Sequence, residues 1–215
     1  MPGRTSHHRF TTRADGDLAI GGVGVAERRA AVVDLPWTWL RQVHGAEVVT
    51  VTLPGEHAGA AADAAVTAVP GAVVAVQSAD CAPVVLLADG VVGVAHGGWR
   101  GLVAGVLPAT AQAMRAVGAG PVRALLGPCV HPGCYEFGEA SLALVAAELG
   151  PAVVGRTTAG APALDVPAAV TASLATVDVP VDTSGSSCTA CRPDALWSHR
   201  ARADAERQAA LAWLT

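Results

Sequence analysis

The chain has 215 residues, which is enough for one domain with a large hydrophobic core and no disulfide or metal support. Its formal net charge is −4, and its 14 basic residues are all arginines, which are scattered and form no basic stripe for nucleic acid. The longest uncharged windows, 64–79 and 101–114, are interrupted by Pro70 and Pro108 and fall short of the roughly 18–20 apolar residues of a membrane span. We therefore expect no nucleic-acid or membrane partner, and a monomer.

The first residues, MPGRTSHHRFTTRADGD, lack the apolar core of a signal peptide, which favours a cytoplasmic protein. The chain has five cysteines, and cysteines stay reduced in the cytoplasm. In that compartment they are better candidates for metal binding or catalysis than for disulfide bridges.

In chain order, the sequence predicts helices alternating with short strands after a segment, 1–25, that has no clear period. The predicted helices cover 26–33, 100–117, 138–149, 167–176 and 201–214. The predicted strands cover 47–53, 72–77, 84–88, 91–95 and 122–127. Pro108 should kink or shorten its helix, and 182–194 should form a loop. No repeat or linker is present, so we expect one α/β domain spanning 1–215.

Two of the predicted strands are separated by Asp89-Gly90, a strong signal for a two-residue hairpin turn. Counting outward from this turn, Pro83 faces His96, and Cys81 becomes a diagonal neighbour of His96 on one side of the ribbon. The proline fits this register, because it falls at a non-hydrogen-bonded pair. The hairpin is therefore expected to bring a thiol and an imidazole toward one point.

A second histidine, His44, precedes Gly45 at an expected strand end in WLRQVHGAE. Two histidines and one cysteine with a free fourth position match a catalytic zinc site, and Cys81 with His96 would equally suit a nucleophile and its base. Alternatively, Cys81 is a small core residue and His96 a structural histidine. Asp80, next to Cys81, would orient a ligand imidazole or bind substrate.

Several stretches together resemble the laccase-domain family, which was first named multicopper polyphenol oxidoreductase and was later identified as purine nucleoside phosphorylases. The family includes the peptidoglycan editing factors. The stretches are RQVHG (41–45), DAAVT (63–67), ADCAPVVL (79–86), HGGWRG (96–101), LGPCVHPGCYEFG (126–138), CT (188–189) and WSHR (197–200).

This resemblance implies a single-domain α/β/α sandwich with a mixed sheet, similar in architecture to the cytotoxic necrotizing factor deamidase. It implies a catalytic Zn²⁺ site with His44, Cys81 and His96 as ligands. It also implies phosphorolysis of adenosine, inosine and methylthioadenosine, with adenosine deamination as a second activity. Bacterial members are further connected to peptidoglycan precursor editing, which would be a Cys/His hydrolase activity.

Phosphorolysis needs cationic groups for phosphate and polar groups for the nucleoside. Arg100 follows His96 by four residues at an expected helix start, which favours phosphate binding. Asp63 would hold a sugar hydroxyl, orient a metal ligand or cap a turn, and Gln42 is similarly open. The predicted substrate-binding residues are Arg41, Gln42, Asp63, Asp80 and Arg100.

The N-terminal segment departs from the family pattern. The family usually has an Arg-x-Gly-Gly-Val-Ser stretch followed by Ser-Leu-Asn, whereas TTRADGDLAIGG (11–22) is shorter and lacks that Ser and Asn. Arg13 in this segment is a further phosphate candidate, so the difference bears on the phosphate pocket and leaves the metal ligands unchanged.

Three alternative functions stay open. A copper polyphenol oxidase needs many imidazoles, but the seven histidines include no His-x-His pair, and Met114 is the only internal methionine available to a blue-copper site. A cysteine hydrolase would use Cys81 as nucleophile and His96 as base. A non-catalytic binding protein is the third alternative, and the intact set of two histidines and one cysteine argues against it. The remaining cysteines suggest a structural zinc site or a thiol switch, although one Cys-x-x-Cys is a weak signal; they are Cys129, Cys134, Cys188 and Cys191.

Overall fold

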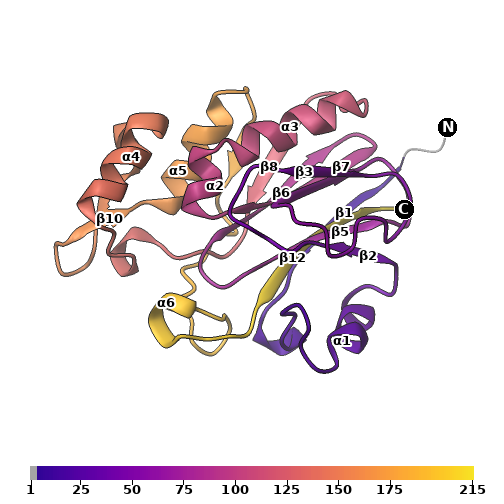
Figure 1. The fold of residues 1–215 in the computed structure, drawn as a ribbon, viewed down its shortest axis with the longest axis horizontal. Helices are drawn as coiled ribbons and strands as arrows, with labels where there is room; N and C mark the ends of the chain where they lie inside the picture. Colours follow the sequence, from indigo (N-terminus) through magenta and orange to yellow (C-terminus); the bar gives the residue numbers. More distant parts are fainter. Residues whose placement is uncertain (1–3) are drawn as a thin grey trace.

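The computed structural model describes residues 4–215, which form two β-sheets stacked face to face between helices (Figure 1). The larger sheet has the order β11-β8-β6-β7-β4-β3, and the smaller has the order β1-β12-β5-β2. The larger sheet consists of β3 (Val48–Val51), β4 (Ala64–Thr67), β6 (Ala82–Ala88), β7 (Val91–Gly97), β8 (Arg123–Leu126) and β11 (Val181–Asp182). The smaller consists of β1 (Ser6–Phe10), β2 (Trp37–Trp39), β5 (Val73–Ser78) and β12 (Gln208–Leu214). Two further strands, β9 (Val154–Arg156) and β10 (Pro162–Leu164), pair separately.

Helices cover the outer faces of both sheets. Figure 1 shows α2, α3 and α5 over the larger sheet and α1 beside the smaller one. The helices are α1 (Val25–Val32), α2 (Trp99–Val103), α3 (Val106–Ala116), α4 (Glu139–Leu149), α5 (Val166–Ala175) and α6 (His199–Arg202), and the 3₁₀ turns are η1 (Arg13–Asp15), η2 (Pro132–Cys134) and η3 (Pro151–Val153). The predicted mixed α/β class is confirmed, but the strands form two stacked sheets where a single sheet was expected. None of the helices formed by residues 4–215 is long and apolar enough to cross a bilayer.

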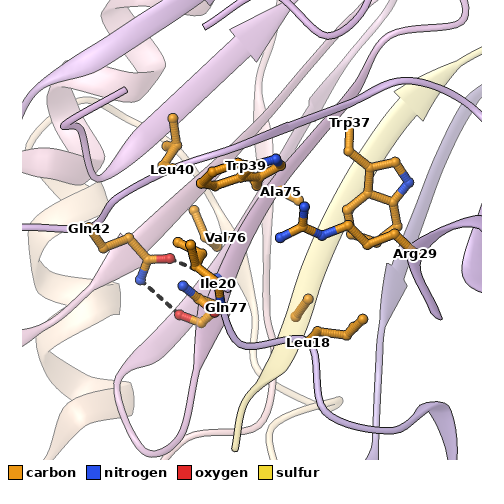
Figure 2. A pocket seen from close by; sticks show the side chains of 11 residues that line it. Leu18, Ile20, Arg29, Trp37, Trp39, Leu40, Gln42, Ala75, Val76 and Gln77 are labelled. Carbon is orange, nitrogen blue, oxygen red and sulfur yellow. Dashed lines mark hydrogen bonds between the residues drawn. The ribbon is translucent and has the colours of Figure 1, made fainter. Parts of the chain in front are cut away.

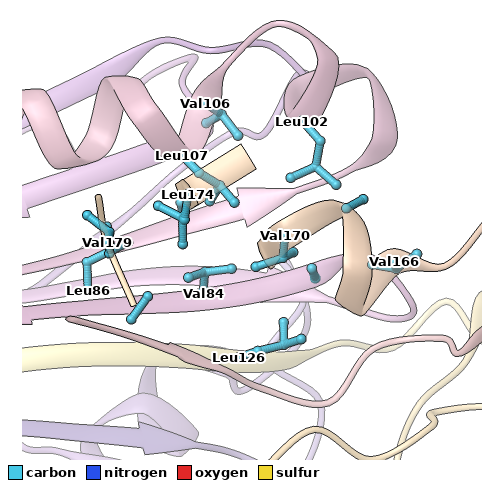
Figure 3. Close-up of a cluster of buried hydrophobic side chains, with 14 of the residues drawn as sticks. Val84, Leu86, Leu102, Val106, Leu107, Leu126, Val166, Val170, Leu174 and Val179 are labelled. Carbon is cyan, nitrogen blue, oxygen red and sulfur yellow. The ribbon is translucent and has the colours of Figure 1, made fainter. Parts of the chain in front are cut away.

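The all-apolar strands are buried on both faces, as predicted. In β6, Val84 and Leu86 face the helices, whereas Val85 and Leu87 face the smaller sheet. Figure 3 shows the first of these two cores, where Leu107 and neighbouring helical side chains pack on the strands. Because each sheet face has an apolar cover, the strands need no polar alternation.

The predicted hairpin is confirmed in detail. Ala88 pairs with Val91 on either side of the Asp89-Gly90 turn, and Pro83 pairs with His96. On the other side of β6, the ladder with β8 begins only at Val84, one residue after the proline. The absent proline N–H therefore limits pairing toward β8 without disturbing the hairpin.

The prediction of a helix at 201–214 was wrong. Only His199–Arg202 is helical, and Ala203, with a φ of 55°, ends the helix. The chain then forms β12, between β1 and β5. The run AALAWL is too short and too uniformly apolar for periodicity to separate strand from helix, and pairing on both sides decided the outcome.

Two other predictions need correction. Residues 6–10 form β1 instead of an irregular segment, and this places His7 and His8 in a strand; residues 1–3 lie outside the described residues. The helix predicted over 100–117 is two helices, interrupted at Gly105, where φ is 83°. Pro108 lies in the first turn of α3, where its absent N–H costs no helical hydrogen bond.

Candidate metal and catalytic site

The three predicted metal ligands meet at one end of the sheet sandwich. Cys81 immediately precedes β6, His96 lies near the end of β7, and His44 lies in the loop before β3. Their coordinating atoms all lie within 4.8 Å of one another, with 3.9 Å between Cys81 Sγ and His44 Nε2. The ligand atoms of a tetrahedral zinc site stand about 3.3–3.8 Å apart, so small side-chain adjustments would complete the geometry. One thiolate and two imidazoles are a donor set that suits zinc.

A single buried carboxylate organises both imidazoles. Asp63 has no exposed surface, and His96 Nδ1 donates to it over 2.8 Å. The same carboxylate accepts hydrogen bonds from the backbone amides of Val43, His44 and Gly45, at 2.8–3.1 Å. With Nδ1 occupied, His96 presents Nε2 toward the cluster, which is the arrangement found behind metal-binding histidines.

Small residues leave room for the cluster. A side chain at Gly98 would place its Cβ 2.5 Å from Cδ2 of His44, so only glycine permits this position of the ring. A Cβ at Gly101 would lie 2.9 Å from the carbonyl oxygen of Gly45. The HGGWRG motif therefore allows the His44 loop to pack directly against the start of α2.

The cluster has strongly shifted pKa values. Burial alone would raise the pKa of the Cys81 thiol, but the charge of His96 and hydrogen bonds from both imidazoles outweigh it and lower the pKa to about 6. Burial alone would lower the pKa of His96, but the Cys81 thiolate and Asp63 raise it to about 9. Without metal, Cys81 and His96 therefore form a thiolate–imidazolium pair at neutral pH.

The cluster opens into two adjoining pockets. The first pocket, called here the arginine lobe, has a volume of about 500 Å³. It is lined by Ile20, Arg41, Gln42, His44, Gln77, Ser78, Ala79, Cys81, His96, His199 and Arg207. The second pocket, called the tyrosine lobe, has a volume of about 390 Å³ and is lined by Ala79, Asp80, Cys81, Tyr135, His199 and Arg200. Cys81 and His199 line both lobes, so the cluster lies where they meet.

Two predicted substrate-binding residues line the arginine lobe. Arg41 is exposed, and its guanidinium makes no hydrogen bond or ion pair with any of residues 4–215. The side-chain amide of Gln42 is held by the backbone at the end of β5 (Figure 2). It donates to the carbonyl oxygen of Gln77 and accepts from the backbone N–H of Gln77, each at 2.8 Å. The positions suit Arg41 for substrate contact and Gln42 for shaping the wall.

Asp80 lines the tyrosine lobe and connects three loops. Its carboxylate accepts hydrogen bonds from the Thr189 hydroxyl and from the backbone amide of Arg200, at 2.5 and 2.6 Å, and its carbonyl oxygen accepts one from Val130. Asp80 has a φ of 106°, a conformation that non-glycine residues rarely adopt. Within residues 4–215, the Asp80 carboxylate makes no hydrogen bond to a histidine ring. Asp63, which hydrogen-bonds to His96, is therefore the better candidate for orienting a metal-binding imidazole.

Arg100 and Arg13 lie outside the two lobes. The Arg100 guanidinium lies 4.4 Å from the centroid of the Trp99 ring, and Arg100 is exposed at the start of α2. Arg13 forms an ion pair with Asp204 at 3.0 Å and stacks on Trp197. Arg13 therefore has a structural role, and phosphate binding by Arg100 stays a prediction.

Sequence reasoning missed four lining residues that have titratable side chains. They are Tyr135, His199, Arg200 and Arg207. Arg200 lies 5.0 Å from the Tyr135 ring centroid, and Arg207 donates to three backbone carbonyls of its own loop. The signal was present, because WSHR and GCYEFG were among the motifs, but only the tertiary structure directs them to Cys81. Ile20 shows that the divergent segment 11–22 still reaches the arginine lobe.

Several known proteins are similar to this chain. A family model described as multi-copper polyphenol oxidoreductase laccase matches residues 24–215. A Streptomyces coelicolor protein named purine nucleoside phosphorylase is 42% identical over 207 residues, covering 94% of this chain and 81% of the relative. A Streptomyces griseus protein named purine nucleoside phosphorylase is 40% identical over 236 residues, covering 98% and 95%.

Solved structures share the fold. A Neisseria meningitidis protein of family DUF152 has a TM-score of 0.86 and 27% identity, and the match covers 97% of this chain and 94% of that protein. The Bacillus licheniformis protein YfiH has the same TM-score at 22% identity, with coverage of 98% and 93%. The chain thus shares its fold with both over nearly its full length.

Proposed function

Because the chain belongs to the multi-copper polyphenol oxidoreductase laccase family and is similar to relatives named purine nucleoside phosphorylase, we propose that it is a zinc-dependent purine nucleoside phosphorylase. The observation that supports this most directly is the two-lobed cleft with the His44, Cys81 and His96 cluster at its junction. One lobe offers Arg41, which has no side-chain partner in the described part of the chain, and the other offers the Tyr135 ring. These groups suit an anion and a purine.

In phosphorolysis, a phosphate oxygen attacks the anomeric carbon of the ribose, and the bond from that carbon to the purine nitrogen breaks. The purine leaves with the electron pair and takes up a proton, which gives ribose 1-phosphate and the free base. We assign phosphate binding to Arg41 and purine contact to the Tyr135 ring. His199 lines both lobes, and we assign to it the protonation of the departing base.

His44, Cys81 and His96 would hold the zinc ion. A bound Zn²⁺ would supply Lewis acidity and a source of hydroxide at neutral pH, which is the chemistry that adenosine deamination requires. We therefore include adenosine deamination as a second activity. Adenosine, inosine and methylthioadenosine are the nucleosides to test for phosphorolysis. A cytoplasmic location stays our expectation, in keeping with five free thiols.

One observation favours a second candidate function. The lowered pKa of Cys81 and its pairing with His96 also suit a metal-independent cysteine hydrolase, as in peptidoglycan precursor editing. A copper oxidase is less well supported, because Met114 is buried among the helices behind Gly93 and cannot serve as an axial ligand to the cluster.

The deciding experiment incubates adenosine with protein of measured zinc content, with and without phosphate, and separates the products by chromatography. Adenine formed only with phosphate, and lost in Cys81→Ala but retained in Cys129→Ala, would support phosphorolysis at this site. Inosine formed without phosphate would support deamination alone. Unchanged adenosine with folded, zinc-loaded protein would overturn the nucleoside proposal and favour the hydrolase.

A further inference from the structure

A second group of sulfur atoms lies outside the metal cluster described above. The Sγ atoms of Cys134, Cys188 and Cys191 all lie within 4.8 Å of one another, and those of Cys134 and Cys191 are 3.4 Å apart. Cys134 ends the η2 turn, whereas the other two belong to a turn more than fifty residues later. The fold thus assembles three thiols that the sequence keeps apart.

The fifth cysteine is not part of this group. Cys129 is fully buried, and its Sγ contacts the Ser186 hydroxyl at 3.6 Å. Of the four cysteines that the sequence left open for a structural zinc site, the structure therefore brings together three.

The local backbone suits negatively charged sulfur. The His131 amide donates to the Cys188 sulfur at 3.5 Å, and the Cys191 amide donates to the Cys188 carbonyl at 3.2 Å, closing a tight Cys-x-x-Cys turn. Cys191 is exposed, and Cys134 and Cys188 are half-buried, so an ion can enter from solvent. Three thiolates this close repel one another strongly unless a cation lies between them.

We propose that Cys134, Cys188 and Cys191 form a second metal site for a thiophilic d¹⁰ ion such as Zn²⁺, separate from the His44, Cys81 and His96 cluster. Thiolate is the preferred ligand of such ions, and a Cys-x-x-Cys turn with a third cysteine is a recurrent source of three ligands. The fourth position faces solvent. This inference does not depend on the proposed enzymatic activity.

The site would fasten together two segments that border the tyrosine lobe. Tyr135 directly follows Cys134, and Thr189, which directly follows Cys188, donates its hydroxyl hydrogen to Asp80. Both Tyr135 and Asp80 line the lobe. A metal ion here would therefore fix the distance between the walls of that lobe.

The first test measures zinc in the reduced full-length protein and three variants. We expect about two equivalents per chain in the wild type and about one in Cys134→Ser/Cys191→Ser. The matched control, Cys129→Ala, should keep about two, and His44→Ala/Cys81→Ala should keep about one. Equal zinc content in the wild type and Cys134→Ser/Cys191→Ser would overturn the proposal.

A second test needs no variant at the cysteine group. Reduced, metal-free protein is alkylated with and without added Zn²⁺, and the modified peptides are quantified by mass spectrometry. Zinc should protect Cys134, Cys188 and Cys191 together. Protection of Cys81 alone, or a Cys134–Cys191 disulfide in protein that takes up no zinc at this group, would contradict the proposal.

Discussion

Nδ1 of His96 lies 2.8 Å from Oδ1 of Asp63, and that carboxylate also accepts the backbone amides of the loop that carries His44. One buried group therefore sets the orientation of an imidazole on β7 and the position of a second imidazole 52 residues earlier in the chain. The two histidines depend on Asp63 together, although neither is its neighbour in sequence.

The first prediction concerns Asp63→Asn. Asparagine has nearly the same side-chain shape as aspartate but lacks the negative charge that orients His96. Its side-chain NH₂ group would also face backbone N–H groups, to which it cannot hydrogen-bond. We expect zinc affinity to fall about 10–100-fold, as for other second-layer partners of metal ligands. Competition with a chromogenic chelator measures this. The control is Asp89→Asn, because Asp89 is exposed and the Asn-Gly pair that it creates suits the same two-residue turn. Equal zinc affinities in the two variants would show that Asp63 does not position the ligands.

The second prediction concerns Gly98→Ala. The new Cβ would lie 2.5 Å from Cδ2 of His44, so the ring must leave its present position in the cluster. We expect zinc affinity to fall about tenfold or more, because the displaced ring no longer holds its nitrogen beside the other two ligands. Circular dichroism checks that the fold is retained. Gly138→Ala, which has no atom within 4 Å of its added Cβ, is the matched control. Wild-type zinc affinity in Gly98→Ala would mean that His44 is not a ligand.

Much of the site could be predicted because it rests on local rules. The Asp89-Gly90 turn fixes the register of β6 and β7, and this register alone placed Cys81 beside His96. His44 was proposed as a third ligand from its position at an expected strand end, and the resemblance supported it. Nothing local shows that its loop wraps around Asp63.

What the sequence could not reveal depends on long-range pairing. The strand β12 looks helical because alanine-rich apolar runs suit either structure, and only its position between β1 and β5 decides. The same misassignment concealed the second sheet. The lining roles of Tyr135 and His199 were also hidden, since their segments reach Cys81 only in the folded chain.

The third prediction is the pH dependence of Cys81 alkylation in the metal-free protein. Thiolate is the reacting form, and His96 and His44 lower the pKa of Cys81 to about 6. The alkylation rate should therefore rise with a midpoint near pH 6 and level off about one pH unit above it. In His96→Gln, which lacks the cation, the midpoint should move upward toward the ordinary value of 9.0.

Peptide mapping follows Cys81 separately from the other thiols in this experiment. Cys129 provides an internal control, because burial raises its pKa to about 12 and it should stay unmodified across the range. A Cys81 midpoint that is the same in the wild type and His96→Gln would refute the thiolate–imidazolium pair.

The last prediction separates two arginines that the sequence proposed for phosphate. Arg41 lines the arginine lobe, and its guanidinium has no partner among residues 4–215, whereas Arg100 stacks on Trp99 and lines neither lobe. If the protein is a phosphorylase, Arg41→Gln should raise the KM for phosphate about tenfold, because a charge-assisted contact is lost, and leave the KM for the nucleoside nearly unchanged. Arg100→Gln should change either KM less than about twofold.

Steady-state kinetics with each substrate varied in turn measures both KM values. The reverse pattern would move the phosphate site to the start of α2, where the helix N-terminus would then act with Arg100.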